Sequence, residues 1–381
     1  MTKIRVLVFL ITLIIVGGVG YVTTLYARGY RFDTKSLRFQ ASGILVVKSD
    51  PDGAQVFVNG ELANATNTTI ALAPATYDVE IKKEGYQPWQ KRLVIEKEVV
   101  TEANASLFKS AASLSPVTLE GAINPVASDN NSKIAFSQNE GLWVLETVNL
   151  PLGFVRDPKR IADGNFIDGA VWEFSPDGSE ILLTSLNGVF LLPSGEFTPQ
   201  NQRVNVFSKK REILLSWDEE GQIKLSAKLR NLPEELQDIL NRKASSVVFS
   251  PDENKILYTA SGSATLGENL IKQLPGASTQ KQERTIRERQ TYVYDIKEDR
   301  NFLIDELEVA LRWFPTSQHL IVAKEGQISI IDYDGTNRQV IYSGSYVDPH
   351  AYPFINTSKL LILTNLGASD SAPNLYSLTI K

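Results

Sequence analysis

Few residues in this 381-residue chain have the types and spacing that catalysis or metal binding requires. The chain contains no cysteine, which excludes disulfides, thiolate metal sites and cysteine nucleophiles. Its two histidines, His319 and His350, lack the spacing of metal ligands, so we expect surface or turn positions for both. No G-x-S-x-G, P-loop or dinucleotide-binding motif is present. The sequence therefore predicts no catalytic, cofactor-binding or metal-binding residue.

Two acidic patterns could be exceptions to this prediction. The stretch Asp332–Asn337 is similar to the opening of a calcium loop, but it lacks the glutamate at the twelfth position and lies between two strands, so we expect a hairpin turn. Carboxylate pairs facing the centre of a ring of strands could instead hydrolyse glycosidic bonds, and the sequence does not fix their separation.

The elements that would position such residues repeat along the last two thirds of the chain. In Trp172–Pro193, an apolar strand runs into the turn Ser175–Gly178, where proline presets φ and glycine accepts a positive φ. The chain returns as a second strand, and a third strand follows Asn187–Gly188. Such a meander cannot bury both faces alone. The repeat-turn positions are Pro176, Asp177 and Gly178 in this copy, and Pro251 and Asp252 in the next.

Related copies predict an array of these units. Ser245–Ser261 has its third strand at Thr291–Ile296, and Leu311–Gly344 has four strands, as does a β-propeller blade. Counting all copies gives about six, with an average period of roughly 44 residues. The weaker copies are Asn124–Glu146, Arg203–Ala227 and Ala351–Ile380. The sequence predicts an all-β chain whose C-terminal part is a six-bladed propeller, or a seven-bladed one if a further copy exists.

The ends of the array predict how the ring closes. The last copy stops after its third strand at the end of the chain, while Ser115–Gly121 precedes the first copy and belongs to no blade. We expect this segment to pair as the outer strand of the last blade, because closure removes exposed sheet edges.

Two segments depart from the repeat. Asn231–Arg242 has a proline near its start and acids in its first turn, which predicts a helix between blades. Gly262–Gln290 is a polar insertion, interpreted as an exposed solvated loop, with a docking arm for a partner as the alternative. Three tryptophans, expected to pack between blades rather than to stack on a ligand, are Trp172, Trp217 and Trp313.

An apolar segment occupies the start of the chain. Val6–Tyr26 carries no charge, and as a helix it would be about 32 Å long, enough for a hydrocarbon core of about 30 Å. We expect an uncleaved anchor rather than a removed signal peptide, because no A-x-A cleavage site follows. Positions along this transmembrane helix are Val6, Leu10, Ile15, Tyr21 and Tyr26.

The orientation of this anchor is open to two interpretations. Lys3 and Arg5 precede it, whereas four basic residues lie within Arg28–Arg38, so the positive-inside count places the C-terminal part in the cytoplasm. The very short N-terminal tail and the β-rich domains that follow favour an extracytoplasmic position instead. A net charge of −5 and a pI near 5.4 argue against nucleic acid as a partner.

Gly43–Phe108 has the pattern of a second, smaller β-unit. Turns at Asp50–Gly53 and Asn59–Gly60 separate short strands, and in Tyr77–Lys82 apolar and charged residues alternate, giving one face for a core and one for solvent. The pattern indicates a small sandwich, preceded by a polar, basic juxtamembrane linker that is either solvated or held by anionic lipid.

This second unit resembles the PEGA domain, a small β-sandwich of bacterial cell-surface proteins. Asp52 replaces the glutamate of the name-giving Pro-Glu-Gly-Ala, and Pro74–Ala75 replaces a usual Pro-Gly. The resemblance implies an envelope module with carbohydrate or cell-wall contact and no catalytic residues. We expect Trp89 of this unit to be exposed. The motif positions are Pro51, Asp52, Gly53, Ala54, Gly60, Gly85 and Tyr86.

The repeats resemble the TolB-like and WD-type propeller families through Phe174–Gly178 and Phe249–Asp252. The resulting organisation is a membrane anchor at 1–28, a linker at 29–42, a PEGA-like sandwich at 43–109 and a propeller at 113–381. We expect a membrane-anchored, noncatalytic scaffold that binds a protein or glycan on the propeller, without a cofactor. The alternative is a propeller enzyme acting on extracellular or cell-wall polysaccharide.

Overall fold

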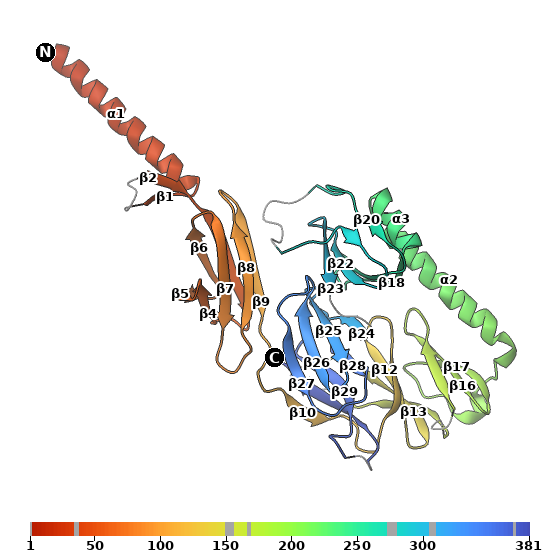
Figure 1. Ribbon diagram of the computed structural model, residues 1–381. Coiled ribbons are helices and arrows are strands. Elements are labelled where there is room, and N and C mark those ends of the chain that lie inside the picture. Colours follow the sequence, from red (N-terminus) through yellow and green to blue (C-terminus); the bar gives the residue numbers. More distant parts are fainter. Residues whose placement is uncertain are drawn as a thin grey trace. The chain divides into compact units, whose positions relative to one another are not determined.

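The computed structural model describes residues 2–33, 38–148, 156–165, 169–272, 280–304, 310–368 and 371–381. Its chain divides into two compact units (Figure 1). The first unit is Met1–Leu107 with Gln273–Lys281, and the second is Phe108–Lys272 with Gln282–Lys381.

The first unit begins with helix α1 (Thr2–Ala27), whose segment Leu7–Ala27 has the length and composition to cross a membrane and is not buried. After it, β1 (Tyr30–Asp33) and β2 (Arg38–Ala41) pair antiparallel, so this part of the chain is not a plain polar spacer. Aromatic contacts explain the difference, because the ring of Phe39 meets those of Tyr26 and Phe32 edge-on, with centroids 5.9 and 5.3 Å apart.

The rest of this unit is a two-sheet sandwich. One sheet has the order β6-β3-β9 and the other β5-β4-β7-β8. Their inner faces share one core, in which Trp89 is only 2 % exposed, so the expectation that it would be exposed was wrong. The strands are β3 (Gly43–Asp50), β4 (Gln55–Val58), β5 (Glu61–Ala65), β6 (Thr68–Leu72), β7 (Ala75–Lys82), β8 (Trp89–Ile95) and β9 (Val100–Ser106).

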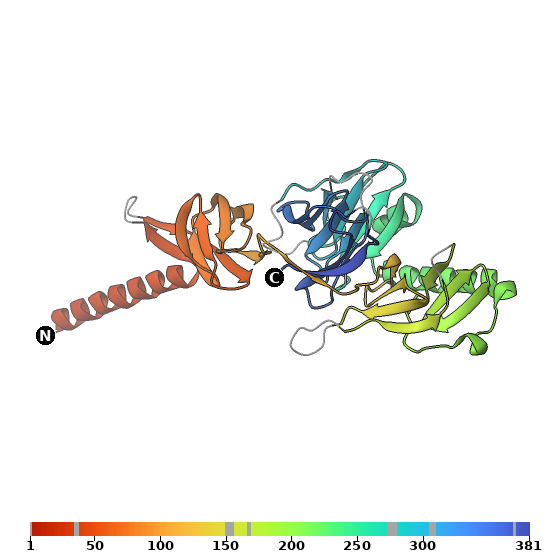
Figure 2. The same cartoon turned by 90° about the horizontal axis from the view of Figure 1, so that it is seen from below.

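The second unit is built from antiparallel sheets of the predicted meander type. The first two are β11 (Ile123–Ala127), β12 (Lys133–Gln138), β13 (Gly141–Glu146) and β14 (Lys159–Asp163), then β15 (Val171–Phe174), β16 (Glu180–Ser185) and β17 (Gly188–Pro193). These two sheets lie side by side (Figure 2) and share a core.

Three further sheets complete the second unit. One contains β18 (Ala244–Phe249), β19 (Lys255–Ala260), β22 (Thr291–Asp295) and β23 (Arg300–Ile304). The next contains β24 (Ala310–Trp313), β25 (His319–Lys324), β26 (Gln327–Asp332) and β27 (Gln339–Ser343). The last contains β28 (Ala351–Pro353), β29 (Lys359–Thr364), β30 (Asn374–Thr379) and β10 (Ser113–Pro116).

The turn after the first strand is built alike in two copies. In the β15–β16 turn, the Asp177 carboxylate accepts hydrogen bonds from the Ser175 hydroxyl, 2.6 Å, and the Ser179 N–H, 2.9 Å, and Gly178 has φ +71°. In the β18–β19 turn, Asp252 accepts from the Ser250 hydroxyl at 2.6 Å. These local bonds explain why the Ser-Pro-Asp pattern marks a hairpin.

Strand β10 joins the two ends of the unit. It pairs antiparallel with β30, Ser113 opposite Thr379, as the outer strand of the last sheet. This confirms the predicted pairing, although the strand begins two residues earlier than Ser115 and ends at Pro116.

One predicted copy of the repeat was wrong. Within Arg203–Ala227 the chain forms all but the last two residues of helix α2 (Lys210–Leu229) instead of blade strands, and Trp217 lies on this helix. The turn signal of the other copies is replaced here by Lys209, Lys210 and Arg211, and long straight-chain residues favour helix. The described residues therefore form five sheets of blade type, one fewer than the six predicted.

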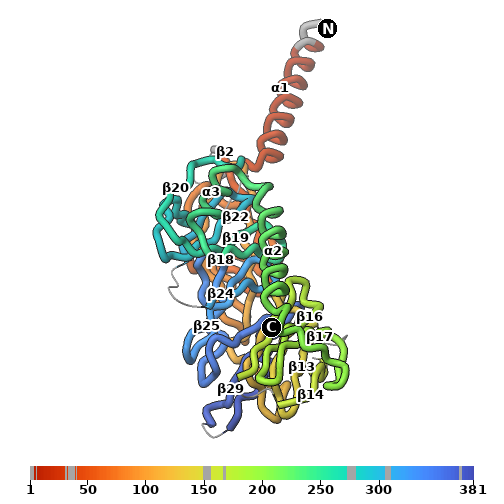
Figure 3. The backbone as a smooth tube through the Cα atoms, turned by 90° about the vertical axis from the view of Figure 1, so that its right-hand side faces the viewer, coloured from red at the N-terminus to blue at the C-terminus, as the bar shows by residue number. Residues whose placement is uncertain are grey.

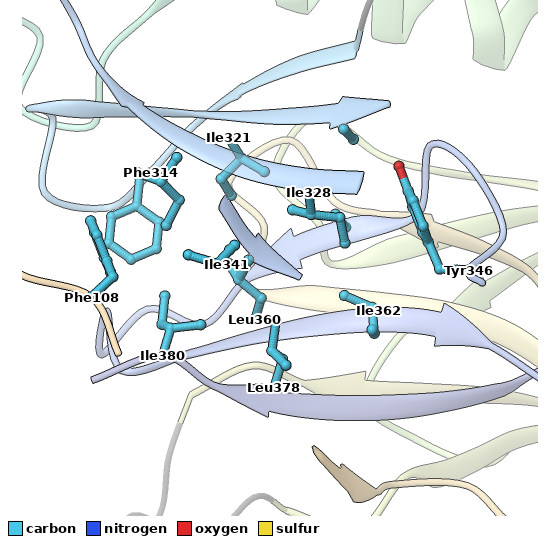
Figure 4. Packing of buried hydrophobic residues seen from close by; sticks show 13 residues of the cluster. Phe108, Phe314, Ile321, Ile328, Ile341, Tyr346, Leu360, Ile362, Leu378 and Ile380 are labelled. Carbon is cyan, nitrogen blue, oxygen red and sulfur yellow. The ribbon is translucent and has the colours of Figure 1, made fainter. Parts of the chain in front are cut away.

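Neighbouring sheets are held together by shared apolar clusters. Figure 4 shows one, in which Ile321 and Ile328 of one sheet face Leu360 and Ile362 of the next. Similar clusters join the last sheet to the first, the first to the second, and the β18 sheet to the β24 sheet. Within the described residues no such cluster joins β15–β17 to the β18 sheet, and α2 spans this junction (Figure 3).

The junction segment continues into α3 (Glu234–Arg242), a helix at the predicted place, which packs on the β18 sheet. The insertion Gly262–Gln290, predicted as a solvated loop, has regular structure at its two ends. Its ends form a two-stranded ribbon, β20 (Ala264–Thr265) with β21 (Thr285–Ile286). The ribbon is fixed because Arg284 forms an ion pair, 2.9 Å, with the fully buried Asp299, and Ile286 enters the core.

Truncation of one hairpin at two leucines tests the shared core. Leu183 is buried between the first and second sheets, whereas Leu186, in the turn of the same hairpin, is exposed. We expect Leu183→Ala to lower the free energy of unfolding by about 2–5 kcal/mol, and Leu186→Ala to change it by less than about 0.5 kcal/mol. Denaturant unfolding of the full chain in detergent, followed by tryptophan fluorescence, measures both. Equal effects would contradict the described packing.

Candidate functional site

The first strands of the sheets in the second unit lie next to one another. The Trp313 indole N–H on β24 donates to the Val248 carbonyl on β18, 3.1 Å, and the Tyr352 hydroxyl on β28 donates to the Pro125 carbonyl on β11, 2.7 Å. Strands β11 and β15 are also in contact. The first strands therefore form the inner wall of the array, where a propeller has its channel.

Ionisable residues are sparse on this wall. In the five first strands as described, Glu173 is the one carboxylate and Arg312 the one base. Glycoside hydrolysis needs two carboxyl groups about 5–10 Å apart, and these strands do not supply a pair. Among the described residues there is also no cluster of three or more histidine, aspartate or glutamate side chains that could hold a metal ion.

The base on the wall belongs to a small polar cluster. The Arg312 guanidinium lies over the Tyr352 ring, 4.9 Å from its centroid, and His350 Nδ1 is 2.7 Å from the Tyr352 hydroxyl oxygen. The single hydroxyl proton of Tyr352 goes to the Pro125 carbonyl, so Nδ1 of His350 is the donor toward Tyr352. Burial raises the pKa of Tyr352 to about 12, which keeps this hydroxyl protonated.

His350 is kept neutral by its surroundings. Burial lowers its pKa below the ordinary value and the Arg312 charge lowers it further, while the Asp348 carboxylate acts in the opposite direction. The ring contact of Arg312 with Tyr352 and the hydrogen bond of Tyr352 to Pro125 join β24, β28 and β11.

The other histidine is not at the surface, contrary to expectation. His319 lies on β25, 3 % exposed, with its ring edge-on to Phe108 and Phe314 at centroid distances of 5.6 and 6.2 Å. Its Nδ1 is 2.7 Å from the Thr316 hydroxyl. Sequence spacing excluded a ligand pair but carried no information on burial, which depends on the neighbouring sheet.

Two of the three tryptophans of the repeat pack between sheets as predicted. Trp172 is buried and donates its indole N–H to the Ala135 carbonyl of the first sheet, 3.2 Å. Trp313 is buried and bonds in the same way to the β18 sheet. Both rings therefore have a structural role between sheets.

The Asp332–Asn337 stretch forms the predicted hairpin turn between β26 and β27. The Asp334 carboxylate accepts hydrogen bonds from the Thr336 hydroxyl, 2.6 Å, and N–H, 3.2 Å. The carboxylate is thereby used within the turn.

The motif positions of the small sandwich also serve its framework. Ala54 is fully buried and its N–H donates to the Thr66 hydroxyl, 3.0 Å, while the Lys83 ammonium donates to the Asp52 carbonyl, 2.7 Å. Turn positions with positive φ are Gly53 (+69°), Gly60 (+82°) and Gly85 (+80°). Pro51 precedes the first of these turns, and the N–H of Tyr86 closes the last by donating to the Lys83 carbonyl, 3.1 Å.

The most distinctive surface of the second unit is apolar. Outside α1, 16 described large apolar side chains are exposed, and 8 of them fall between residues 171 and 248. Their exposed fractions range from 49 % to 87 %. We call these residues the apolar surface: Val171, Leu186, Phe197, Val204, Phe207, Leu215, Ile223 and Val248.

Sequence reasoning missed this apolar surface. It assigned Arg203–Ala227 to blade strands, in which residues such as Leu215 and Ile223 would be covered. The missing Pro-Asp-Gly signal at Lys209–Arg211 was the one available warning that this copy differs. Exposed large apolar side chains that are concentrated in one part of a domain indicate an interaction site, so the apolar surface, defined by this stretch of the sequence, is the candidate functional site.

Comparison with known protein families supports the interpretation of the smaller unit as a PEGA-like domain. Residues 42–111 match the model of the PEGA domain family. No curated protein matches the sequence of the chain.

Three solved structures with similar arrangements are distant in sequence. TolB from Acinetobacter baumannii is 12 % identical, with 80 % of this chain and 59 % of that chain covered and a TM-score of 0.24. A protein assigned as TolB in Agrobacterium tumefaciens is 13 % identical, with 69 % and 80 % covered and a TM-score of 0.24. The β-propeller domain of Cps50 (Swd1) from Myceliophteria thermophila is 9 % identical, with 71 % and 100 % covered and a TM-score of 0.28.

Substitutions around His350 test the electrostatics of the inner wall. Arg312→Met removes a charge that lowers the His350 pKa, so the pKa should rise but stay below 6.5, because burial remains. Asp348→Asn removes the opposing charge, so the pKa should fall. The chain has only two histidines, so both ring signals can be followed in an NMR titration. Shifts of the same sign in the two variants would refute the arrangement.

Proposed function

We propose that this chain is a membrane-anchored cell-envelope protein whose two β-units form a noncatalytic scaffold for binding another protein. The observation that carries the proposal is the apolar surface, half of the exposed large apolar side chains outside α1 gathered in one stretch of the second unit. The PEGA match at residues 42–111 supports an envelope setting.

A protein partner fits the apolar surface better than a glycan does. Six of its eight residues are aliphatic, and exposed aliphatic side chains gain most from desolvation against a protein. Glycan sites rely on flat aromatic rings with polar neighbours, and Trp172 and Trp313 are buried between sheets. The polysaccharide-enzyme alternative would need a second carboxylate beside Glu173 on the inner wall.

Membrane attachment rests on α1. Its segment Leu7–Ala27 has 21 residues, about 32 Å as a helix, against a hydrocarbon core of about 30 Å. The segment also fits a signal sequence. We favour an anchor with the β-units outside the cytoplasm, because a PEGA domain is a surface module.

Removal of the anchor and protease treatment test the location. Deletion of residues 2–28 should move the chain from the membrane to the soluble fraction, since no other described helix is long and apolar enough to span. In the intact chain, protease added to cells with a permeabilised outer layer should digest the β-units. Digestion only after lysis would place them in the cytoplasm and contradict the envelope proposal.

Site-specific photo-crosslinking on intact cells tests the binding surface. A photoreactive residue at Leu186, 87 % exposed on the apolar surface, should give one discrete adduct with an envelope protein. The matched control is Leu119, which is 80 % exposed but lies outside the apolar surface. Leu215→Ser should weaken the Leu186 adduct, because it makes another position of the apolar surface polar. No adduct, or equal labelling at Leu119, would contradict the proposal.

A further inference from the structure

The junction between β15–β17 and the β18 sheet differs from the other junctions of the array. Elsewhere, neighbouring sheets share an apolar cluster, whereas here the described residues provide none. Val171 on β15 and Val248 on β18 are each about half exposed, although both lie on first strands of the inner wall. The position between these two sheets has the character of a vacant blade, with α2 lying across it (Figure 3).

The sequence across this junction has the pattern of a blade. Val204–Ser226 and Val171–Pro193 have the same length, and in both a Phe-Ser pair is followed by Glu-Ile-Leu-Leu and then by a glycine that precedes further apolar residues. The junction sequence has one residue fewer between the Phe-Ser pair and the glutamate and one more before the glycine. Phe207–Ser208 corresponds to Phe174–Ser175, and Glu212–Leu215 to Glu180–Leu183. Gly221 then takes the place of Gly188 at the start of the third strand.

The helical conformation leaves most of these apolar residues unburied and contains unfavourable features. Of the twenty residues of α2, only Leu229, at its end, is buried. Three consecutive apolar residues, Ile213–Leu215, spread around a helix instead of forming one stripe, whereas the same run is buried throughout in strand β16. Lys209 makes no side-chain capping bond, and Gly221 lies in the helix interior, where glycine is unfavourable.

We infer that Val204–Ser226 has a second conformation, a three-strand meander that occupies the vacant position and completes a sixth blade. Its first strand would contain Val204–Phe207, its second Ile213–Ser216 and its third Gln222–Leu225. This conformation would cover apolar residues that the helix leaves exposed, among them Leu215 and Ile223. The array would then be open with α2 formed and closed with the blade formed, so part of the apolar surface would be available only in the open state.

The two conformations differ sharply in one distance. In the blade, Leu215 pairs with Ile223 as Leu183 pairs with Phe190 in β16–β17, which places their Cβ atoms about 4.5–5.5 Å apart. In α2, the same residues are eight positions apart, about 12 Å along the axis. A disulfide needs Cα atoms about 4.4–6.8 Å apart, so it can join these positions only in the blade.

The test is a cysteine pair in the full chain, which has no native cysteine to interfere. Both positions are exposed, so Leu215→Cys with Ile223→Cys should leave the starting fold intact. We expect mild oxidation to form the intramolecular disulfide, and the ellipticity at 222 nm to decrease by the contribution of α2. The control is Ser216→Cys with Ile223→Cys, whose side chains would lie on opposite faces of the hairpin. Cross-linking no greater than in this control would overturn the inference.

Local unfolding of α2 would also allow cross-linking. Tryptic cleavage after Lys224 distinguishes an unfolded segment from the blade. In the blade, Lys224 lies in the third strand, so the oxidised variant should resist tryptic cleavage after Lys224 more than the reduced one. Faster cleavage after oxidation would mean an unfolded segment and would overturn the inference.

Gly221→Ala provides a graded test of the equilibrium. Alanine favours the helix interior, and Gly188, the corresponding residue in β17, has φ +137°, which alanine adopts poorly. Adding this change to the Leu215/Ile223 cysteine pair should therefore slow cross-linking by about fivefold or more. An unchanged or higher rate would overturn the inference, because the helix would then not compete with the cross-linked state.

Discussion

The second unit depends on burial that neighbouring sheets share. A sheet of three or four strands has two faces and cannot cover both by itself, so each sheet uses the next as its cover. The cluster containing Ile321, Ile328, Leu360 and Ile362 takes its members from two sheets, and so do three other clusters. Loss of one sheet would therefore expose apolar side chains on its neighbours. The eight residues of the apolar surface lie in the part of the sequence that spans the junction without a shared cluster.

The turns were predictable because their chemistry is local. Asp177 bonds to a hydroxyl and an N–H two residues away on either side, and Asp252 repeats the first of these bonds. No distant contact is needed, so the residues themselves identify the hairpins. The same holds for α1, because its uncharged segment Leu7–Ala27 is long enough to cross a membrane, and for the PEGA turns with glycine at positive φ.

The remaining features were not predictable because they depend on competition between local and distant contacts. The run Ile213–Leu215 suits a central strand, but the lysines and arginine before it suit a helix, and the sequence does not give the balance. The burial of His319 and Trp89 is set by sheets that cover them from elsewhere in the chain. The apolar surface follows from the same balance, since Leu215 and Ile223 are exposed only because α2 replaces strands.

The pairing of β10 with β30 also sets an order of events during synthesis. Pro116 and Tyr376 are opposite each other in the sheet but about 260 residues apart in the chain. At translation rates of roughly 5–20 residues per second, β10 would wait roughly 15–50 s for its partner after it is made. During that interval α1 has already left the ribosome, so any entry of its Leu7–Ala27 segment into a membrane would precede completion of the last sheet. The C-terminal strand is thus the final piece of the array, and a chain that ends early leaves β10 with an unpaired edge.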